Sequence, residues 1–300
     1  MAKSKKAPQS QGRCMFCGGT GLTKQHLWPD WLNDYVPRQD NHGNLKSESY
    51  FGITPDSATS YTSEPAKKVI QGSLGSRKLR QVCEGCNGGW MSKIEEGSKN
   101  TILSLMNQDE ATLTRSQQFE LVSWITLMTM VNEFTDLPMR AIPYRERQYL
   151  LIHRLPPSDW NIWIGRHQQG QSEDWTQMNG HHGYLVASNT GEERGLSEET
   201  TNALRKDRLA LPKNVQSSTF CIKGLVLVVL SSVDPAIKGE LAKAVYPDMV
   251  KIWPADPGDI IWSQIRAVPD EEMQLRVDYI ETILKNYVDR MNAQTTNAQA

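Results

Sequence analysis

Two pairs of cysteines constrain this chain more than any other feature of its sequence. Cys14 and Cys17 form one C-x-x-C step, and Cys83 and Cys86 form a second one far along the chain. Two intervening residues allow both thiolates of a pair to reach one ion, and two such pairs supply the four ligands of a tetrahedral structural zinc site. A closed site of this kind has no open position for a substrate, so we expect zinc to hold the fold and any chemistry to occur beside it.

Four ordinary buried thiols, or two disulfide bonds, are the alternatives to a zinc site. Residues 1–6 contain no apolar run of the kind that marks a secretory signal. We therefore expect a cytoplasmic protein, in whose reducing surroundings a metal is favoured over disulfides. The most apolar helix that we expect, residues 114–134, is interrupted by polar residues too often to span a membrane, so no membrane partner is expected.

The residues beside the cysteines carry a resemblance to a known family. The segment KQHLWP follows the first pair at residues 24–29, and the second pair continues as CEGCNGGWM at residues 83–91. This order resembles the HNH, or ββα-metal (His-Me finger), endonuclease superfamily, in particular its zinc-containing, endonuclease VII-like branch, in which Asn follows the second C-x-x-C. The signature C-x-x-C-N-x-G-W-M is also similar to that of a group of bacterial and phage proteins. The matching segments cover roughly the first third of the chain.

The resemblance implies a metal-dependent endonuclease that hydrolyses phosphodiester bonds in DNA, in a phage, mobile-element or defence system. By position, His26 would be the general base, and Asn87 would bind a catalytic Mg²⁺ or Mn²⁺ ion. Gln25 stands where such sites have Asp, Glu or His, and its carbonyl oxygen could bind the ion without contributing a charge. A carboxylate borrowed from Asp30 or Glu84 is one way to supply that charge.

One histidine and one ion are sufficient for this chemistry. A histidine accepts a proton near neutral pH, and a divalent ion stabilises the charge that develops on the phosphorane and on the leaving oxygen. If the resemblance to the family is set aside, His26 is interpreted as a surface histidine that precedes a helix, and Asn87 as a helix N-cap. The alternative function is therefore a zinc-stabilised module that binds nucleic acid or protein and has lost catalysis.

The charge of the chain is nearly balanced. The net charge is −1 at pH 7 and the pI is about 6.6, so the chain lacks the strongly basic balance of a dedicated nucleic-acid binder. Lys and Arg nevertheless exceed Asp and Glu over residues 1–97, and the reverse holds in the remainder. The residues that we expect to face phosphate are Lys24, Lys67, Lys68, Arg77, Lys78 and Arg80. A merely solvated basic face is the alternative.

We predict an α+β chain with a zinc-stapled ββα-metal module over residues 14–110. A domain of helices and a mainly antiparallel sheet follows over residues 111–291. The basic residues 1–13 and the polar residues 292–300 are expected to be disordered tails. The second domain carries no catalytic signature, so we expect it to position DNA, bind a protein partner or form a homodimer.

Hydrophobic periodicity and turn residues place the individual elements. Helices are predicted at residues 30–35, 89–106, 114–134, 144–153 and 270–291, and strands at residues 22–26, 160–165, 183–187, 219–222, 224–230 and 251–253. Thr114 and Gln117 form a capping box. The strand at 224–230 is apolar throughout, which predicts a central position in the sheet. Residues 38–66 are predicted to be a long loop that holds a hairpin, and His181-His182 are predicted to lie in a turn.

Overall fold

The computed structural model describes residues 12–36, 44–46, 52–53, 68–70, 76–107, 110–135, 137–168, 177–186 and 213–297. Most of the predicted basic tail and of the predicted loop over residues 38–66 lies outside these residues, as does Lys67. The described part of the chain mixes helix and sheet, which agrees with the predicted α+β class.

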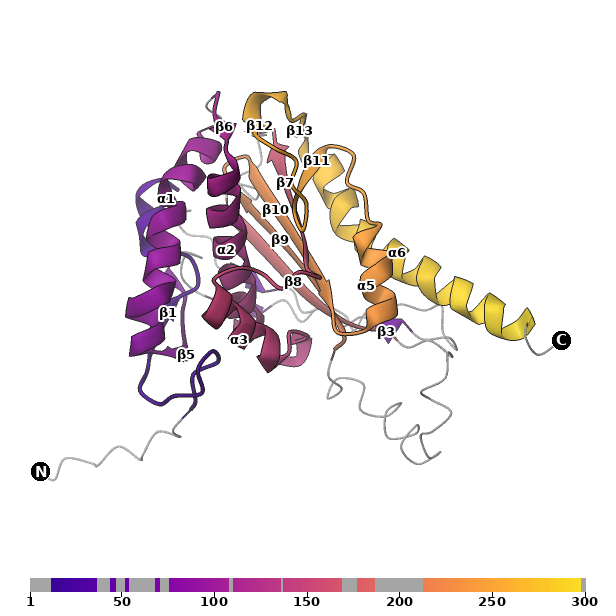
Figure 1. Ribbon diagram of the computed structural model, residues 1–300, viewed down its shortest axis with the longest axis horizontal. Coiled ribbons are helices and arrows are strands. Elements are labelled where there is room, and N and C mark those ends of the chain that lie inside the picture. Colours follow the sequence, from indigo (N-terminus) through magenta and orange to yellow (C-terminus); the bar gives the residue numbers. More distant parts are fainter. Residues whose placement is uncertain are drawn as a thin grey trace, which may run out of the picture.

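A sheet lies at the centre of the molecule (Figure 1). Among the described residues it has seven strands: β3 (Gly52–Ile53), β7 (Asn161–His167), β8 (Gln177–Val186), β9 (Val215–Ile222), β10 (Leu225–Ser232), β11 (Met249–Trp253) and β13 (Ala267–Val268). The order is β11-β7-β10-β9-β8-β3, and β13 also pairs with β7. The long strands pair antiparallel as predicted, and only the short β3 and β13 pair parallel with their neighbours among the strands described.

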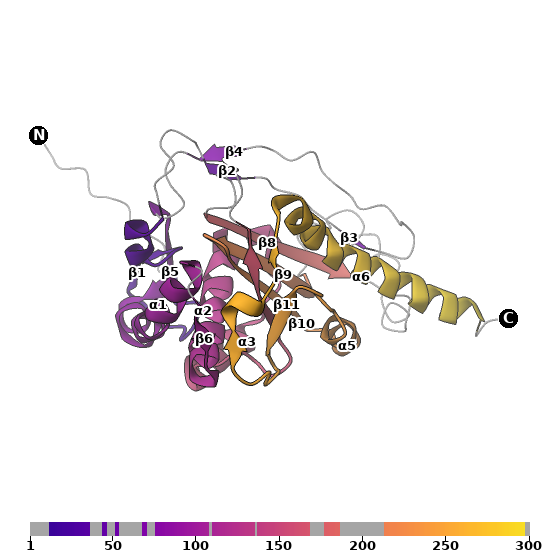
Figure 2. The same ribbon diagram turned by 90° about the horizontal axis from the view of Figure 1, so that it is seen from above.

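Helices cover both faces of this sheet. On one face lie α1 (Ser92–Met106) and α2 (Arg115–Asn132), with α3 (Tyr144–His153) against α2. On the other lie α5 (Pro235–Ala242) and α6 (Asp270–Asn297), and Figure 2 shows the same arrangement from above. No helix in the described part of the chain is long and apolar enough to cross a membrane.

Smaller elements complete the described fold. Three two-stranded antiparallel sheets are formed by β1 (Leu22–His26) with β5 (Lys78–Cys83), β2 (Asn44–Lys46) with β4 (Lys68–Ile70), and β6 (Thr112–Leu113) with β12 (Ile260–Ile261). Short 3₁₀ helices are η1 (Asp30–Asp34), η4 (Glu133–Thr135), η5 (Leu137–Met139) and η8 (Trp262–Gln264), and η3 (Cys86–Met91) is π-helical. The predicted helix at residues 30–35 is thus a 3₁₀ helix.

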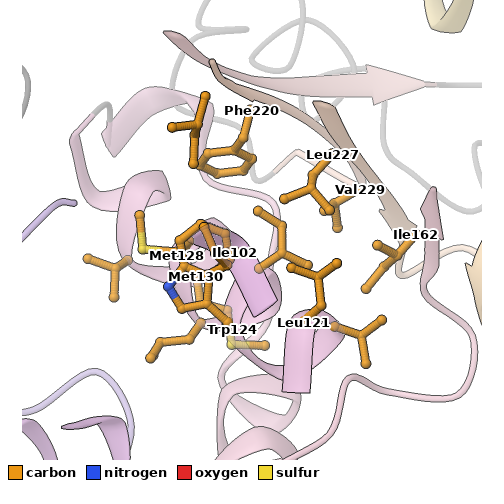
Figure 3. Packing of buried hydrophobic residues seen from close by; sticks show 14 of the residues in the cluster. Ile102, Leu121, Trp124, Met128, Met130, Ile162, Phe220, Leu227 and Val229 are labelled. Carbon is orange, nitrogen blue, oxygen red and sulfur yellow. The ribbon is translucent and has the colours of Figure 1, made fainter. Parts of the chain in front are cut away.

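Strand β10 organises the core because successive side chains of a strand point to opposite faces of its sheet. Leu225, Leu227 and Val229 belong to the hydrophobic cluster under α1 and α2. Val226, Val228 and Leu230 belong to the cluster under α5 and α6. Figure 3 shows the first cluster, with Leu227, Val229 and Phe220 of the sheet facing side chains of α2 such as Leu121 and Trp124. The predicted central position of this strand is confirmed by its pairing with both β7 and β9.

The hydrophobic cluster under α1 and α2 crosses the predicted domain boundary near residue 110. It includes Phe16 and Trp28 from the cysteine region as well as Phe220 from β9. The indole of Trp28 meets the ring of Phe220 edge-on, with ring centroids 5.8 Å apart. The cysteine region therefore packs on the same core as the sheet.

Two helix termini bear directly on the predictions. The capping box is confirmed, because Thr114 Oγ1 accepts from the backbone of Gln117 while Gln117 Oε1 accepts from the N–H of Thr114 at 2.9 Å. The last helix, α6, continues to Asn297, so the predicted disorder over residues 292–300 is wrong for residues 292–297. This segment contains no Gly or Pro to end the helix.

One further prediction is wrong, and two elements of the fold were not predicted. His181 and His182 lie inside β8 rather than in a turn, because the strand begins at Gln177. Strand β5 and helix α5 were not predicted. The alternation in β5 is mainly of charged and half-buried residues, and α5 is only eight residues long, so neither gives a clear periodic signal.

A buried ion pair joins the end of α2 to α3. The carboxylate of Glu133 is fully buried and accepts hydrogen bonds from the backbone N–H groups of Ala141 and Ile142, the latter at 2.7 Å. It also accepts from the guanidinium of Arg147, which lies over the ring of Phe134. A buried charge that loses its partner is strongly destabilising, so this pair makes the fold sensitive to substitution here.

We predict that Glu133→Gln lowers the free energy of unfolding by about 3–5 kcal/mol, because it leaves the buried guanidinium of Arg147 without a counter-charge. Urea unfolding followed by circular dichroism measures this loss. The matched control is Glu272→Gln, which removes a carboxylate paired with Arg266 at the surface and should leave the unfolding midpoint nearly unchanged. Equal effects of the two substitutions would contradict the prediction.

Candidate functional site

The four paired cysteines converge on one point. Cys14 and Cys17 lie in a turn before β1, Cys83 ends β5, and Cys86 begins η3. The antiparallel ladder sets Leu22 opposite Cys83, which brings the two cysteine pairs together. All four sulfur atoms lie within 4.8 Å of one another, and the Sγ atoms of Cys17 and Cys83 are 3.5 Å apart.

This spacing fits a metal ion. Zn–S bonds of about 2.3 Å directed to the corners of a tetrahedron place the sulfur atoms about 3.8 Å apart. None of the four clustered cysteines is in a disulfide, and the 3.5 Å between the Sγ atoms of Cys17 and Cys83 is well beyond the length of an S–S bond, about 2.05 Å. The four clustered cysteines could therefore hold one metal ion such as zinc.

The thiols of the cluster differ in the direction of their pKa shifts. Although burial raises the pKa of Cys14, hydrogen bonds from backbone N–H groups, first that of Cys17, lower it to about 7. Burial raises the pKa of Cys86, which also has the other thiols of the cluster beside it. Four thiolates cannot gather without a cation, because like charges at this distance oppose ionisation. A bound divalent ion would remove that repulsion.

The predicted site residues divide between the two faces of β1. Gln25 is 6% exposed and faces α1, where its Nε2 donates to Glu95 Oε1 at 3.1 Å. Thr23 lies two residues earlier on the strand, and its Oγ1 accepts from Asn87 Nδ2 at 3.0 Å. The structure thus brings Gln25 and Asn87 to the helix side of the strand. No hydrogen bond or ion pair among the described residues joins either side chain to His26.

His26, at the end of β1, pairs with Asp30 of η1. Its Nε2 is 3.3 Å from Asp30 Oδ1, and the two side chains are 23% and 75% exposed. Burial lowers the pKa of His26 below its ordinary value; Asp30 acts in the opposite sense, and Lys78 lowers it further. The imidazole is therefore mainly neutral at neutral pH, which is the state a general base requires.

Basic side chains surround His26 on the exposed side of the strand pair. Lys78 is the residue opposite His26 in the ladder, and it is exposed, as are Lys24 and Arg80. Arg77 is half-buried. Lys68 lies in β4, where the structure describes only the backbone, and Lys67 lies outside the described residues. Three of the six predicted phosphate-facing residues thus gather on one exposed strip.

The carboxylates lie differently from the two that the sequence suggested. Asp30 contacts His26 rather than Gln25, and Glu84 is exposed between the second pair of cysteines. Glu95, which sequence reasoning missed, contacts Gln25 instead, and burial raises its pKa to about 6 although the bond from Gln25 lowers it. No sequence signal marked this residue, because its contact with Gln25 depends on how α1 packs against β1.

Comparisons with known proteins leave the family open. No protein-family model, no curated protein and no solved structure matches this chain.

We predict that Cys17→Ser reduces the bound metal and lowers the melting temperature, because three remaining thiolates cannot close a four-ligand site. Metal content by mass spectrometry of the purified protein and a thermal melt measure the two effects. Cys221→Ser is the control, since Cys221 is buried in β9 and is not one of the four clustered cysteines. It should lower stability while leaving the metal content unchanged. Full metal content in Cys17→Ser would contradict a four-cysteine site.

Proposed function

We propose that this protein is a zinc-stabilised, metal-dependent endonuclease of the HNH type that hydrolyses phosphodiester bonds in DNA. The observation that supports it most is the pairing of His26 with Asp30 on an exposed basic strip, on the strand pair whose other end carries the cysteine cluster. The order of β1, β5 and the following helix agrees with a zinc-stapled ββα-metal module. Zinc is the metal proposed for the cysteines, because four thiolates without an open position suit its tetrahedral preference.

In this proposal Asp30 orients the base. A carboxylate beside Nε2 favours the tautomer that carries its proton there, which leaves Nδ1 as the atom that accepts a proton from the attacking water. Lys24, Lys78 and Arg80 hold the phosphate backbone on the exposed strip. The side chains of Gln25 and Asn87 offer amide oxygens on the helix side of β1, and oxygen donors suit a hard cation. A Mg²⁺ or Mn²⁺ ion bound there would supply positive charge to the phosphorane and the leaving oxygen.

A second function is favoured by one specific observation. The side chain of Gln25 is uncharged, and it faces α1 while His26 lies on the other face of β1. A chain with this arrangement could bind DNA or a protein through the same basic strip without cleaving anything. The two proposals share the zinc site and the strip, and they differ in whether His26 and a divalent ion at Gln25 and Asn87 carry out a reaction.

We predict that His26→Ala abolishes cleavage of plasmid DNA in Mg²⁺ or Mn²⁺, because it removes the proton acceptor. Plasmid relaxation and linearisation on a gel measure the rate, and zinc content and the melting temperature should stay unchanged. The control His153→Ala replaces an exposed histidine of α3 and should cut like the parent protein. Cleavage that survives His26→Ala would remove this residue from the mechanism. A parent protein that binds DNA but never cuts would favour the second function.

We predict that Lys78→Ala combined with Arg80→Ala weakens DNA binding equally across sequences and reduces the slope of log K against log salt by about 2. Fluorescence anisotropy with labelled duplex DNA measures both, in the His26→Ala background so that the probe stays intact. Lys243→Ala is the control, because Lys243 is an exposed lysine at the end of α5, on the opposite face of the sheet. An unchanged salt slope would show that Lys78 and Arg80 make no phosphate contacts and that the strip is merely a solvated basic surface.

A further inference from the structure

Gln25 and Glu95 form a polar pair between two elements that are far apart in sequence. Gln25 projects from β1 and is 6% exposed, and Glu95 lies in the first turn of α1. Their bond, from Nε2 to Oε1 at 3.1 Å, satisfies polar atoms that are otherwise shielded from water. The pair therefore fixes which end of the Gln25 amide faces the helix.

The direction of this hydrogen bond follows from the chemistry of its two partners. An amide side chain has one donor end and one acceptor end, whereas an ionised carboxylate only accepts. Glu95 therefore selects the NH₂ end of Gln25, and the carbonyl oxygen is turned away from Glu95. The opposite placement would set two acceptor oxygens against each other.

The same arrangement occurs at Asn87, through a hydroxyl group. Thr23 Oγ1 donates its single proton to the carbonyl oxygen of Val82 at 3.3 Å, so it can only accept from Asn87. Asn87 accordingly presents its NH₂ end to Thr23, at 3.0 Å, and its carbonyl oxygen is the end turned away. Thr23 and Gln25 are two residues apart on β1, so both amides are held at the same face of the strand.

We propose that Glu95 is a positioning residue for a divalent cation: it holds the amide of Gln25 with the carbonyl oxygen available as a ligand and sets a negative charge directly behind it. The inference rests on the proposed function, in which Gln25 and Asn87 bind the catalytic ion. A carboxylate that accepts from a ligand's N–H fixes the ligand's orientation and makes its other end a stronger donor. Gln25 in β1 carries no charge, so in this proposal Glu95 in α1 supplies the negative charge of the site.

The test measures cation binding rather than cleavage. Full-length, zinc-loaded protein is titrated with Mn²⁺, and free Mn²⁺ is followed by electron paramagnetic resonance. Glu95→Gln should weaken Mn²⁺ binding about 10–100-fold, the usual effect of removing a partner behind a metal ligand. Glu96→Gln is the matched control, because it removes the same charge from the exposed neighbouring position of the same helix. It should leave Mn²⁺ affinity unchanged.

An exchange of the two side chains separates positioning from simple cross-linking of β1 to α1. In Gln25→Glu combined with Glu95→Gln, the amide on the helix can donate to a carboxylate on the strand, so the hydrogen bond is kept and the carboxylate becomes the ligand. Mn²⁺ affinity should return at least to that of the parent protein. If Glu95 only links the two elements, Glu95→Gln lowers the unfolding midpoint and leaves Mn²⁺ affinity as it was, which would overturn the inference.

The outcomes distinguish this inference from the proposed function. If the parent protein binds Mn²⁺ and cuts DNA but Glu95→Gln has the same Mn²⁺ affinity, the role of Glu95 is overturned and the proposed nuclease function is unaffected. If Glu95→Gln weakens Mn²⁺ binding but the parent protein cuts no DNA, the cation site is supported and the proposed nuclease function is rejected. Parent protein that binds no Mn²⁺ overturns the role of Glu95, and the His26→Ala experiment then decides on cleavage separately.

Discussion

The convergence of four sulfur atoms from two distant segments is the constraint on which the candidate site depends. It sets the end of β5 beside the start of β1, and the ladder between these strands then determines which side chains face α1 and which face solvent. Gln25 and Thr23 turn to the helix, while Lys24 is exposed and His26 meets η1. A metal bound by the cysteines would therefore influence the reaction only indirectly, by fixing the positions of β1 and β5.

The strand pair is in turn held by the larger core. Helices α1 and α2 lie between it and the central sheet, and side chains of β10 are buried on both faces. The Glu133–Arg147 pair ties the end of α2 to α3 inside this layer. Residues beyond the predicted boundary near 110, among them Phe220 of β9 and Leu121 of α2, thus belong to the same hydrophobic cluster as Phe16 and Trp28 of the cysteine region.

Much of this fold could be predicted from the sequence, where one local signal was strong. The strand at Leu22–His26, the capping box of α2 and the central position of β10 each follow from a period or a turn residue, and each is confirmed. The close approach of the four cysteines followed from their spacing. Elements without a periodic signal, such as β5 and α5, are not predicted by the sequence. The predicted last helix ends at residue 291, short of Asn297, because the polar composition beyond it is also typical of disorder.

The candidate site was less accessible to sequence reasoning, because its contacts depend on register. The identities of His26, Gln25 and Asn87 came from a resemblance to a family, and the comparisons neither support nor exclude that family. The contact of Asp30 with His26 is local in the sequence, since only three residues separate the end of β1 from the start of η1. The contact of Glu95 with Gln25 could not be anticipated, because it needs the strand bulge near Lys24, the kink at Gly89 and the packing of α1 to coincide.

The packing of Trp28 on Phe220 has a consequence for how this chain can change over evolution. Trp28 is two residues beyond His26, and its indole is fully buried against a side chain of β9. A cysteine module cut out at residue 110 would expose that indole and lose the surface that orients the chain around His26. The strand pair and the sheet must therefore be inherited together, and recombination that moves the module alone should rarely leave a working descendant.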